Sequence, residues 1–243
     1  LPCASRSTCS NIKKPLIMNK FRPEANFVQG LSGDFIGKNN IFRMIREFAR
    51  YSNINSGYYM EFGIMNGDTA ITAYRNLRGY VNHIYGFDTF SGHPEQKETD
   101  QIHPEYAPYF FQGNYAAVSD EFCKKNIAAA TLLNSNNIHL FKGVFSDTLQ
   151  SFDKSQLKDK DFPICILVDC DLYSSAKEVF DFLTNICQTG TWLLIDDYWC
   201  YRGDPKLGVR KAFDDWIESN PRVGASFYCN FNAYSRAYIC YEK

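Results

Sequence analysis

Long hydrophobic runs are missing from this sequence of 243 residues, although 45% of the residues are hydrophobic. The longest apolar runs have the length of single β-strands, and none approaches the roughly 20 residues that a membrane-spanning helix needs. A surplus of charge of one sign is missing too, because the formal net charge is −1. Surfaces that bind nucleic acid or acidic membranes need an excess of positive charge. We therefore expect neither a membrane nor a nucleic acid as a partner.

Cysteine motifs that would indicate a disulfide framework are missing as well. The nine cysteines are odd in number, and no two of them form a CxxC motif. Most lie inside apolar segments, whereas Cys3 and Cys9 lie in a Ser-rich start that has no apolar core long enough for a signal peptide. This pattern favours reduced, buried thiols in a cytoplasmic protein over a set of disulfides.

Residues 1–37 show little hydrophobic periodicity and contain several Gly and Pro residues, so we expect an N-terminal arm there. Residues 38–243 contain no linker and no internal repeat, which predicts a single domain. Apolar residues in that part of the chain follow helical and strand patterns in alternation. Strands are expected over 58–62, 83–88, 138–143, 163–169, 191–196, 225–231 and 236–242. Helices are expected over 38–54, 68–79, 116–135, 146–152, 174–190 and 207–220.

This alternation predicts an α/β fold with a doubly wound, mostly parallel sheet of seven strands. The last two strands are separated by only "NAYS", residues 232–235, which predicts a C-terminal antiparallel hairpin. Ser146 is the expected N-cap of the short fourth helix. In such sheets ligands bind outside the carboxyl ends of the strands. The acidic residues discussed next lie at or near such ends.

A glycine-containing turn follows the first strand in "YYMEFGIMNGDT", with Glu61, Gly63 and Gly67. Glycine lets the backbone bend sharply and approach a ligand closely. The spacing is neither the GxGxxG of a dinucleotide fold nor a phosphate loop. Glu61 would repel a pyrophosphate and suits a cationic group, such as an amine or a sulfonium-linked amino acid. An ordinary glycine turn is the alternative.

Asp88 ends the second strand in "IYGFDTFSG". An acidic residue at this position commonly accepts hydrogen bonds from ribose hydroxyls; the alternative is an exposed Asp that caps a loop. Taken with Glu61 and Gly63, the pattern indicates a nucleoside with an uncharged or cationic tail. S-adenosylmethionine fits this description, and NAD fits it poorly.

Four aspartates follow two buried strands, Asp169 and Asp171 in "VDCD" and Asp196 and Asp197 in "IDD". The strand ends are expected to be neighbours, so that Asp169, Asp196 and Asp197 converge. Three carboxylates without His or Cys make a hard oxygen site, which suits Mg²⁺ rather than Zn²⁺. Asp171 is expected to support the loop or to cap the next helix. The alternative is that all are strand-end aspartates that bond loop amides.

Other side chains near the expected site remain open. His93 and His103 lie in the polar stretch 91–114 over the site, where they either assist as acid or base or are simply exposed. Tyr198 and Trp199 form either an aromatic wall or part of the core. Arg210 contacts the acceptor or faces solvent.

Five segments, in this order, resemble the macrocin O-methyltransferase family: "EFGIMNGDT", "YGFDTFSGHPE", "GVFSDTL", "VDCDLYSS" and "IDDYW". The resemblance spans roughly residues 57–218. It implies a class I, Rossmann-like methyltransferase that uses S-adenosyl-L-methionine and Mg²⁺ to methylate sugar hydroxyls.

Carried over to this sequence, the family pattern implies that Asp169, Asp196 and Asp197 hold Mg²⁺ and that Asp169 is also the general base. It places Glu61 and Gly63 at the methionine end of the cofactor and Asp88 at the ribose. The full set of expected cofactor-binding residues is Glu61, Gly63, Gly67, Thr69, Asp88, Ser91 and Gly143.

The chain departs from the family pattern in residues 1–37, in 93–114 and in "CYRGDPKLGVR", which are the parts that should contact the acceptor. The expected partner is a small hydroxylated acceptor: a sugar is favoured, and phenol and polyketide hydroxyls also fit. The aromatic content leaves self-association into a homo-oligomer open. Two other functions are considered: an Mg²⁺-dependent phosphohydrolase with "VDCD" as nucleophile and acid, and a non-catalytic methyltransferase-like binding subunit.

Overall fold

The computed structural model of the protein describes residues 37–157 and 162–243. The expectation of an N-terminal arm over residues 1–37 lies, apart from Gly37, outside these residues. None of the helices in the described ranges is both long and apolar enough to cross a membrane.

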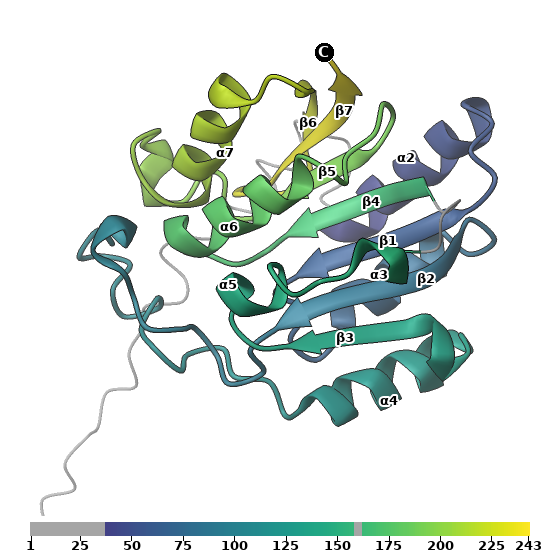
Figure 1. The fold of residues 1–243 in the computed structure, drawn as a ribbon, viewed down its shortest axis with the longest axis horizontal. Helices are drawn as coiled ribbons and strands as arrows, with labels where there is room; N and C mark the ends of the chain where they lie inside the picture. The colour runs from purple at the N-terminus through teal and green to yellow at the C-terminus, as the bar shows by residue number, and fades with distance from the viewer. Residues whose placement is uncertain (1–36, 158–161) are drawn as a thin grey trace, which may run out of the picture. The chain divides into compact units, whose positions relative to one another are not determined.

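In the described part of the chain, seven strands form one sheet in the order β3-β2-β1-β4-β5-β7-β6 (Figure 1). Strands β1 to β5 pair with one another in parallel, and β7 is antiparallel to both β5 and β6. The prediction of a mostly parallel sheet with a C-terminal antiparallel hairpin is confirmed. The strands are β1 (Gly57–Phe62), β2 (Val81–Asp88), β3 (Ile138–Lys142), β4 (Phe162–Val168), β5 (Trp192–Ile195), β6 (Val223–Asn230) and β7 (Arg236–Glu242).

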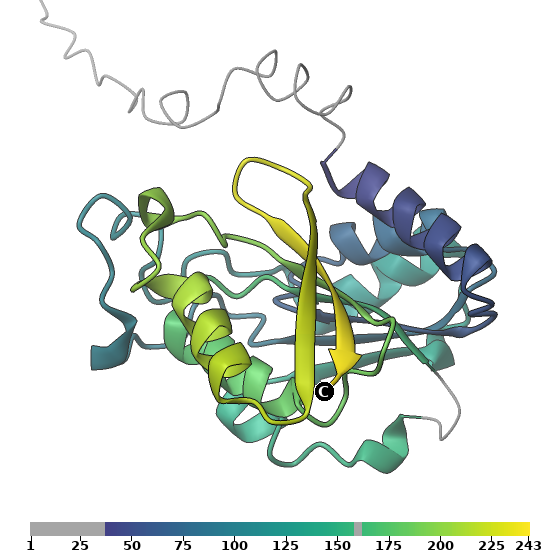
Figure 2. The ribbon, with the colours of Figure 1, turned by 90° about the horizontal axis from the view of Figure 1, so that it is seen from above.

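Helices cover both faces of the sheet, because successive side chains of a strand point to opposite faces. On β1, Tyr58, Met60 and Phe62 pack in a hydrophobic cluster with α6 and α7, whereas Tyr59 packs in a second cluster with α2, α3 and α4. Figure 2 shows α2 (purple) and α7 (yellow-green) on opposite sides of the sheet. The α-helices are α2 (Gly37–Tyr51), α3 (Asp68–Asn76), α4 (Asp120–Thr131), α5 (Phe145–Thr148), α6 (Tyr173–Leu183) and α7 (Gly208–Ser219).

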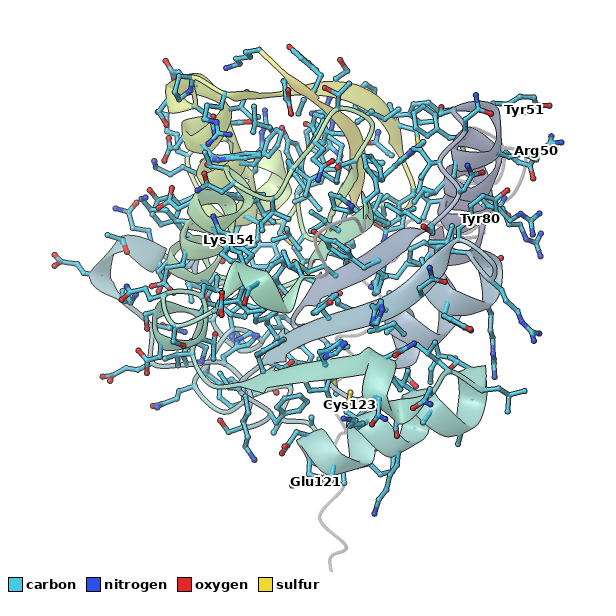
Figure 3. The ribbon with its side chains drawn as sticks, turned by 45° about the vertical axis from the view of Figure 1, so that its right-hand side comes forward. Arg50, Tyr51, Tyr80, Glu121, Cys123 and Lys154 are labelled. Carbon is cyan, nitrogen blue, oxygen red and sulfur yellow. The ribbon has the colours of Figure 1, made fainter. Side chains whose placement is uncertain are left out.

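The α4 helix illustrates how local chemistry sets the bounds of an element. Its N-cap is Ser119, whose hydroxyl accepts a hydrogen bond from the backbone of Phe122 at 3.0 Å, so the helix begins later than the expected 116. It ends where Leu132 adopts a left-handed conformation. Figure 3 shows Cys123 and Glu121 of this helix; Cys123 is buried against the sheet and Glu121 is exposed.

The capping prediction for Ser146 is wrong, and so is one of the two roles considered for Asp171, the cap of the next helix. Helix α5 begins at Phe145 with Val144 as its N-cap, so Ser146 lies inside the first turn, where its hydroxyl donates to Asp147. Asp171 does not cap α6, because the N-cap position is held by Leu172 without a side-chain bond.

The cap of α6 comes from the segment after β2 instead. Asp100, in a 3₁₀ turn at Glu98–Asp100, is buried and accepts hydrogen bonds from the backbone N–H of Ser174 at 2.8 Å and from its hydroxyl at 3.1 Å. Further along this segment, Phe110 packs with Leu172 and Tyr201 in a third hydrophobic cluster. These contacts tie the long polar segment to the edge of the sheet where β4 and β5 end.

Candidate active site

The register of the parallel strands brings the ends of β1, β4 and β5 side by side. Phe62 pairs with Val168, and Val168 pairs with Ile195. The next residues continue this register, since the N–H of Asp169 donates to the Phe62 carbonyl and the N–H of Asp196 to the Val168 carbonyl, both at 2.9 Å. The acidic residues of "VDCD" and "IDD" therefore meet at one edge of the sheet, as the sequence predicted.

Two glycines in the turn after β1 allow close approach of other parts of the protein. Gly63 has φ +90°, and a Cβ there would lie 1.8 Å from the carbonyl oxygen of Asp169. Gly67 has φ +85° at the N-cap of α3, and a Cβ would lie 2.6 Å from Ile127 of α4. Both positions therefore require glycine for the fold itself, and Gly63 lets the ends of β1 and β4 lie in contact.

Asp88 at the end of β2 holds the neighbouring loops. Its carboxylate accepts the backbone N–H of Met65 at 2.8 Å and of Phe90 at 2.6 Å. Burial raises the pKa of Asp88 above its ordinary value, and these two hydrogen bonds oppose the rise. Asp88 thus caps loops, although it is half-buried and not exposed as in the alternative considered for it. It lies at the strand end where a ribose-binding acid is expected.

A cavity of about 450 Å³ opens beside the loop that follows Asp88. It brings together Ser91 and Gly143, two of the residues expected to bind the cofactor, from the segments that follow β2 and β3. Glu61, Gly63 and Thr69 do not line it. The residues that line the cavity are Thr89, Ser91, His93, Pro94, Glu95, Gln112, Gly113, Gly143 and Val144.

Glu61 is fully enclosed near the end of β1, with 1% of its surface exposed. The Tyr59 hydroxyl donates a hydrogen bond to its carboxylate at 2.9 Å. Burial raises the pKa of Glu61 well above its ordinary value, and the positive charge of Lys38 opposes this rise. A cationic group bound nearby would favour the ionised form of Glu61.

Lys38 of α2 is a site residue that the sequence analysis missed. Its ammonium lies 3.0 Å from Asp169 Oδ2 and 3.0 Å from Asp196 Oδ2, and 3.4 Å from the Thr69 hydroxyl. Burial lowers the pKa of Lys38, but the two carboxylates outweigh this effect and raise the pKa above its ordinary value. One signal was available: a Lys in the first turn of a helix is unfavourable beside the positive end of the helix dipole, and a carboxylate partner offsets this effect.

The four aspartates separate into two groups. In the described part of the chain, Asp169, Asp171 and Asp197 form the one acidic cluster suited to a metal, with one oxygen from each lying within 4.8 Å of the others. Asp196 is held elsewhere: it accepts bonds from the Ser235 hydroxyl and the Asp197 backbone N–H as well as from Lys38. Of the three residues expected to hold metal, two are in this cluster, and Asp171 takes the place of Asp196.

The charges of these carboxylates follow from burial and from their neighbours. Burial raises the pKa of Asp169 to about 7; Asp196 adds to the rise and Lys38 opposes it. Burial also raises the pKa of Asp171 to about 6 and that of Asp197 well above its ordinary value. Burial acts in the same direction on Asp196, but Lys38 and Ser235 outweigh it and lower the pKa. Within the cluster Asp169 pairs with Lys38, whereas Asp171 and Asp197 form no ion pair with a Lys or Arg among the described residues. The hard oxygen donors of the cluster fit a divalent cation.

His93 and Cys200 contact the cluster from outside. His93 Nε2 lies 2.7 Å from Asp171 Oδ2, and the Cys200 thiol donates to Asp197 Oδ1 at 3.1 Å. The side chain of His93 is only 8% exposed, so the expectation of an exposed loop histidine is wrong for this residue. Its Nδ1 has no hydrogen-bond partner among the described residues. His103 instead accepts a hydrogen bond from the backbone of Glu105 in its own loop.

The aromatic residues after "DD" belong mainly to the core. Tyr198 is 3% exposed and packs against Phe213 and Tyr238, so the core interpretation is confirmed for it. The guanidinium of Arg210 lies over the rings of Tyr198 and Trp199, at 5.5 and 5.0 Å from their centres. Arg210 therefore packs on aromatic rings and does not simply face solvent.

The fold and the acidic edge of the sheet define a class of protein, the α/β methyltransferases with a seven-stranded sheet. Within that class, the sequence profile of the macrocin-O-methyltransferase family (TylF) matches residues 20–220, and the chain belongs to this family. Membership of this family does not support the alternative function of an Mg²⁺-dependent phosphohydrolase. A comparison with individual curated proteins returns no match.

Solved structures share the fold. The O-methyltransferase NovP has a TM-score of 0.63 at 19% sequence identity, covering 83% of this chain and 78% of that one. The calicheamicin methyltransferase CalS11 has a TM-score of 0.63 at 18% identity, covering 82% and 78%. An O-methyltransferase from Bacillus cereus in complex with SAH has a TM-score of 0.51 at 16% identity, covering 89% of each chain. At these identities the likeness establishes the fold.

Proposed function

We propose that this methyltransferase transfers the methyl group of S-adenosyl-L-methionine to a hydroxyl group next to a bound Mg²⁺, on a sugar or a glycosylated natural product. The proposal rests mainly on the cluster of Asp169, Asp171 and Asp197. This cluster lies at the same edge of the sheet as the turn after β1. Related structures support the acceptor class: CalS11 is described as a TDP-rhamnose 3'-O-methyltransferase.

The cofactor is proposed to lie across the ends of β1, β2 and β3. Glu61, Gly63, Gly67 and Thr69 surround the methionine end, where the buried carboxyl of Glu61 suits an ammonium group. Asp88 is proposed to accept hydrogen bonds from the ribose hydroxyls. Ser91 and Gly143 line the cavity of about 450 Å³ that is proposed for the adenine. The SAH complex of the Bacillus cereus enzyme supports this choice of cofactor.

The cation is proposed to be held by Asp169 and Asp197, together with Asp171 in place of the expected Asp196. When bound, Mg²⁺ would lower the pKa of the acceptor hydroxyl and hold it in position. Asp169 is proposed to accept the hydroxyl proton, because it belongs to the cluster that would hold the cation beside the acceptor. The acceptor oxygen then bonds to the methyl carbon as the bond from sulfur to that carbon breaks.

The reaction is proposed to take place in the cytoplasm. The seven cysteines in the described ranges are all free, as expected in a reducing compartment. Cys3 and Cys9 lie outside those ranges.

Transfer of a labelled methyl group from S-adenosyl-L-methionine to a panel of sugars with vicinal hydroxyls tests the proposal. Asp169→Asn should lower turnover about 10²- to 10⁴-fold, the usual contribution of a general base. Its affinity for the cofactor should stay near that of the unaltered protein. Asp181→Asn, at an exposed ion pair with Lys177 on α6, is the matched control and should leave both quantities unchanged. An Asp169→Asn variant with normal turnover would contradict the role of Asp169.

A further inference from the structure

Two of the four histidines of the chain face each other on neighbouring strands, away from the acidic edge of the sheet. Nδ1 of His83 on β2 lies 3.3 Å from Nε2 of His139 on β3. His83 precedes Asp88, the last residue of β2, by five residues (88 − 83), which is roughly 17 Å along a strand. The pair therefore lies toward the amino ends of the strands and takes no part in the proposed methyl transfer.

The register of the sheet explains why these two side chains meet. Tyr85 of β2 pairs with His139 of β3, and His83 lies two residues before Tyr85, so all three side chains point to one face. The ring of Tyr85 stacks on His139, with 4.6 Å between the ring centres and 12° between the planes, and it lies 6.3 Å from the ring of His83. Aromatic packing thus holds both imidazoles in place.

The distance between the two nitrogens suits ligands of one metal ion. In a tetrahedral zinc site with Zn–N bonds of about 2.0–2.1 Å, two ligand nitrogens lie about 3.3 Å apart. As a hydrogen bond the 3.3 Å contact is long, since N–H groups usually lie about 2.7–3.2 Å from their acceptors. Imidazole nitrogen binds Zn²⁺ and does not suit Mg²⁺. His139 is only half-buried, so an ion and water can reach the pair.

We propose that His83 Nδ1 and His139 Nε2 bind one Zn²⁺ ion, with water completing a tetrahedral site. Each neutral imidazole carries one proton, so a proton on either of the facing nitrogens moves to the other nitrogen of its own ring when the ion binds. The ion would connect β2 to β3, which lies at one edge of the sheet in the described part of the chain (Figure 1). This inference does not depend on the proposed function.

Nitrogen NMR of the imidazole rings tests the inference on the full, unaltered chain. The protein is first stripped of metal with a chelator, and Zn²⁺ is then added in the presence of excess Mg²⁺, which competes for the carboxylates. Single His variants assign the four side chains. The ring nitrogens of His83 and His139 should shift together as one equivalent of Zn²⁺ is added. No shift in this pair, or shifts confined to His93 and His103, would overturn the inference.

Zinc affinity of a ligand variant supplies a second test. His139→Phe keeps a ring to stack on Tyr85 and removes one ligand. Loss of a partner outside the ligand shell already costs about 10- to 100-fold in affinity, so this variant should bind Zn²⁺ at least about tenfold more weakly. The increase in unfolding temperature that Zn²⁺ gives the unaltered protein should be lost. His103→Phe, in the segment after β2, is the matched control and should retain both properties. Thermal unfolding without metal checks that each variant is folded.

The outcomes separate this inference from the proposed function. If His139→Phe binds Zn²⁺ as tightly as the unaltered protein does, the ion lies elsewhere and the inference is overturned, whether or not S-adenosyl-L-methionine binds. Failure of the unaltered protein to bind S-adenosyl-L-methionine contradicts the proposed function alone, because the histidine pair lies away from the proposed cofactor site.

Discussion

At the scale of single residues, the buried carboxyl of Glu61 links stability to ligand binding. Burial raises its pKa well above the ordinary value, so the folded protein retains a proton that the unfolded chain loses as pH rises above about 4.5. Because the ionised form is disfavoured in the folded state, Glu61 lowers the free energy of unfolding as pH rises above about 4.5. The same carboxyl is proposed to meet the ammonium group of the cofactor, which would favour its ionised form.

We predict opposite effects of Glu61→Gln on stability and on binding. The amide carbonyl can still accept the hydrogen bond from Tyr59, and the variant should unfold about 2–4 °C higher at pH 8, with little change near pH 4. Its affinity for S-adenosyl-L-methionine should fall about tenfold, because a charged hydrogen bond is lost. Thermal unfolding and calorimetry measure the two effects. Glu121→Gln on the exposed face of α4 is the control; a destabilised Glu61→Gln at pH 8 would refute the account.

Sequence reasoning located the acidic residues of the site but missed their partners. Asp169 and Asp196 were predicted to meet because parallel strands end at a common edge, and the backbone register brings them together. Lys38 contacts Asp169 from 131 residues away along the chain, and only the packing of α2 against the sheet creates that contact. The pairing of His93 with Asp171 likewise depends on the path of a loop that has no periodic pattern.

At the scale of elements, the segment after β2 and the start of α6 depend on one another. Asp100 accepts hydrogen bonds from the backbone of Lys97 at 2.7 Å and from the backbone and hydroxyl of Ser174. It is 2% exposed, so water does not replace these bonds when the carboxylate is removed. The conformation of the segment that covers the site is thus coupled to the helix that follows "VDCD".

We predict that Asp100→Ala loosens this coupling. The buried N–H of Ser174 would lose its partner, and the free energy of unfolding should fall by about 1–3 kcal/mol. Hydrogen exchange should increase in residues 94–115 and in the first turn of α6. Glu98→Ala, an exposed change in the same 3₁₀ turn, should alter neither quantity. Unchanged exchange in both segments of Asp100→Ala would show that the coupling is absent.

The order and type of the elements followed from hydrophobic patterns, whereas their ends did not. Buried runs such as residues 163–169 are recognisable because apolar side chains are needed on both faces of a central strand. The helix expected over 174–190 stops at Leu183, since turns that follow a helix can also contain apolar residues. Ser146 was mistaken for a cap because a cap depends on backbone geometry that composition does not reveal.

At the scale of the whole molecule, the acidic cluster should make stability depend on pH and on Mg²⁺ together. The pKa of Asp169 is raised to about 7 and that of Asp171 to about 6, so the folded state holds protons that the unfolded state has lost above about pH 4. Their contribution to the free energy of unfolding therefore decreases as pH rises from about 4 to 7. Mg²⁺ competes with these protons and should bind more tightly as pH rises.

We predict that Mg²⁺ raises the unfolding temperature more at pH 8 than at pH 5. At about a hundred times its dissociation constant, it should raise that temperature by about 5–10 °C at pH 8 and by little at pH 5. Taking the difference with and without Mg²⁺ at each pH removes the contributions of other titrating groups. NaCl at matched ionic strength is the control. An equal rise at both pH values would contradict binding at carboxylates with raised pKa.

The central claim is that the turn after β1 and the loop after β2 bind S-adenosyl-L-methionine, while the cation serves the acceptor. Calorimetric titration of S-adenosyl-L-methionine and of its demethylated product, with Mg²⁺ and with a chelator, tests this claim most directly. We predict that both compounds bind, and that their affinities change less than about threefold when the metal is removed. Absence of binding under both conditions would contradict the account, because the residues around Glu61 and Asp88 would then not form a cofactor site.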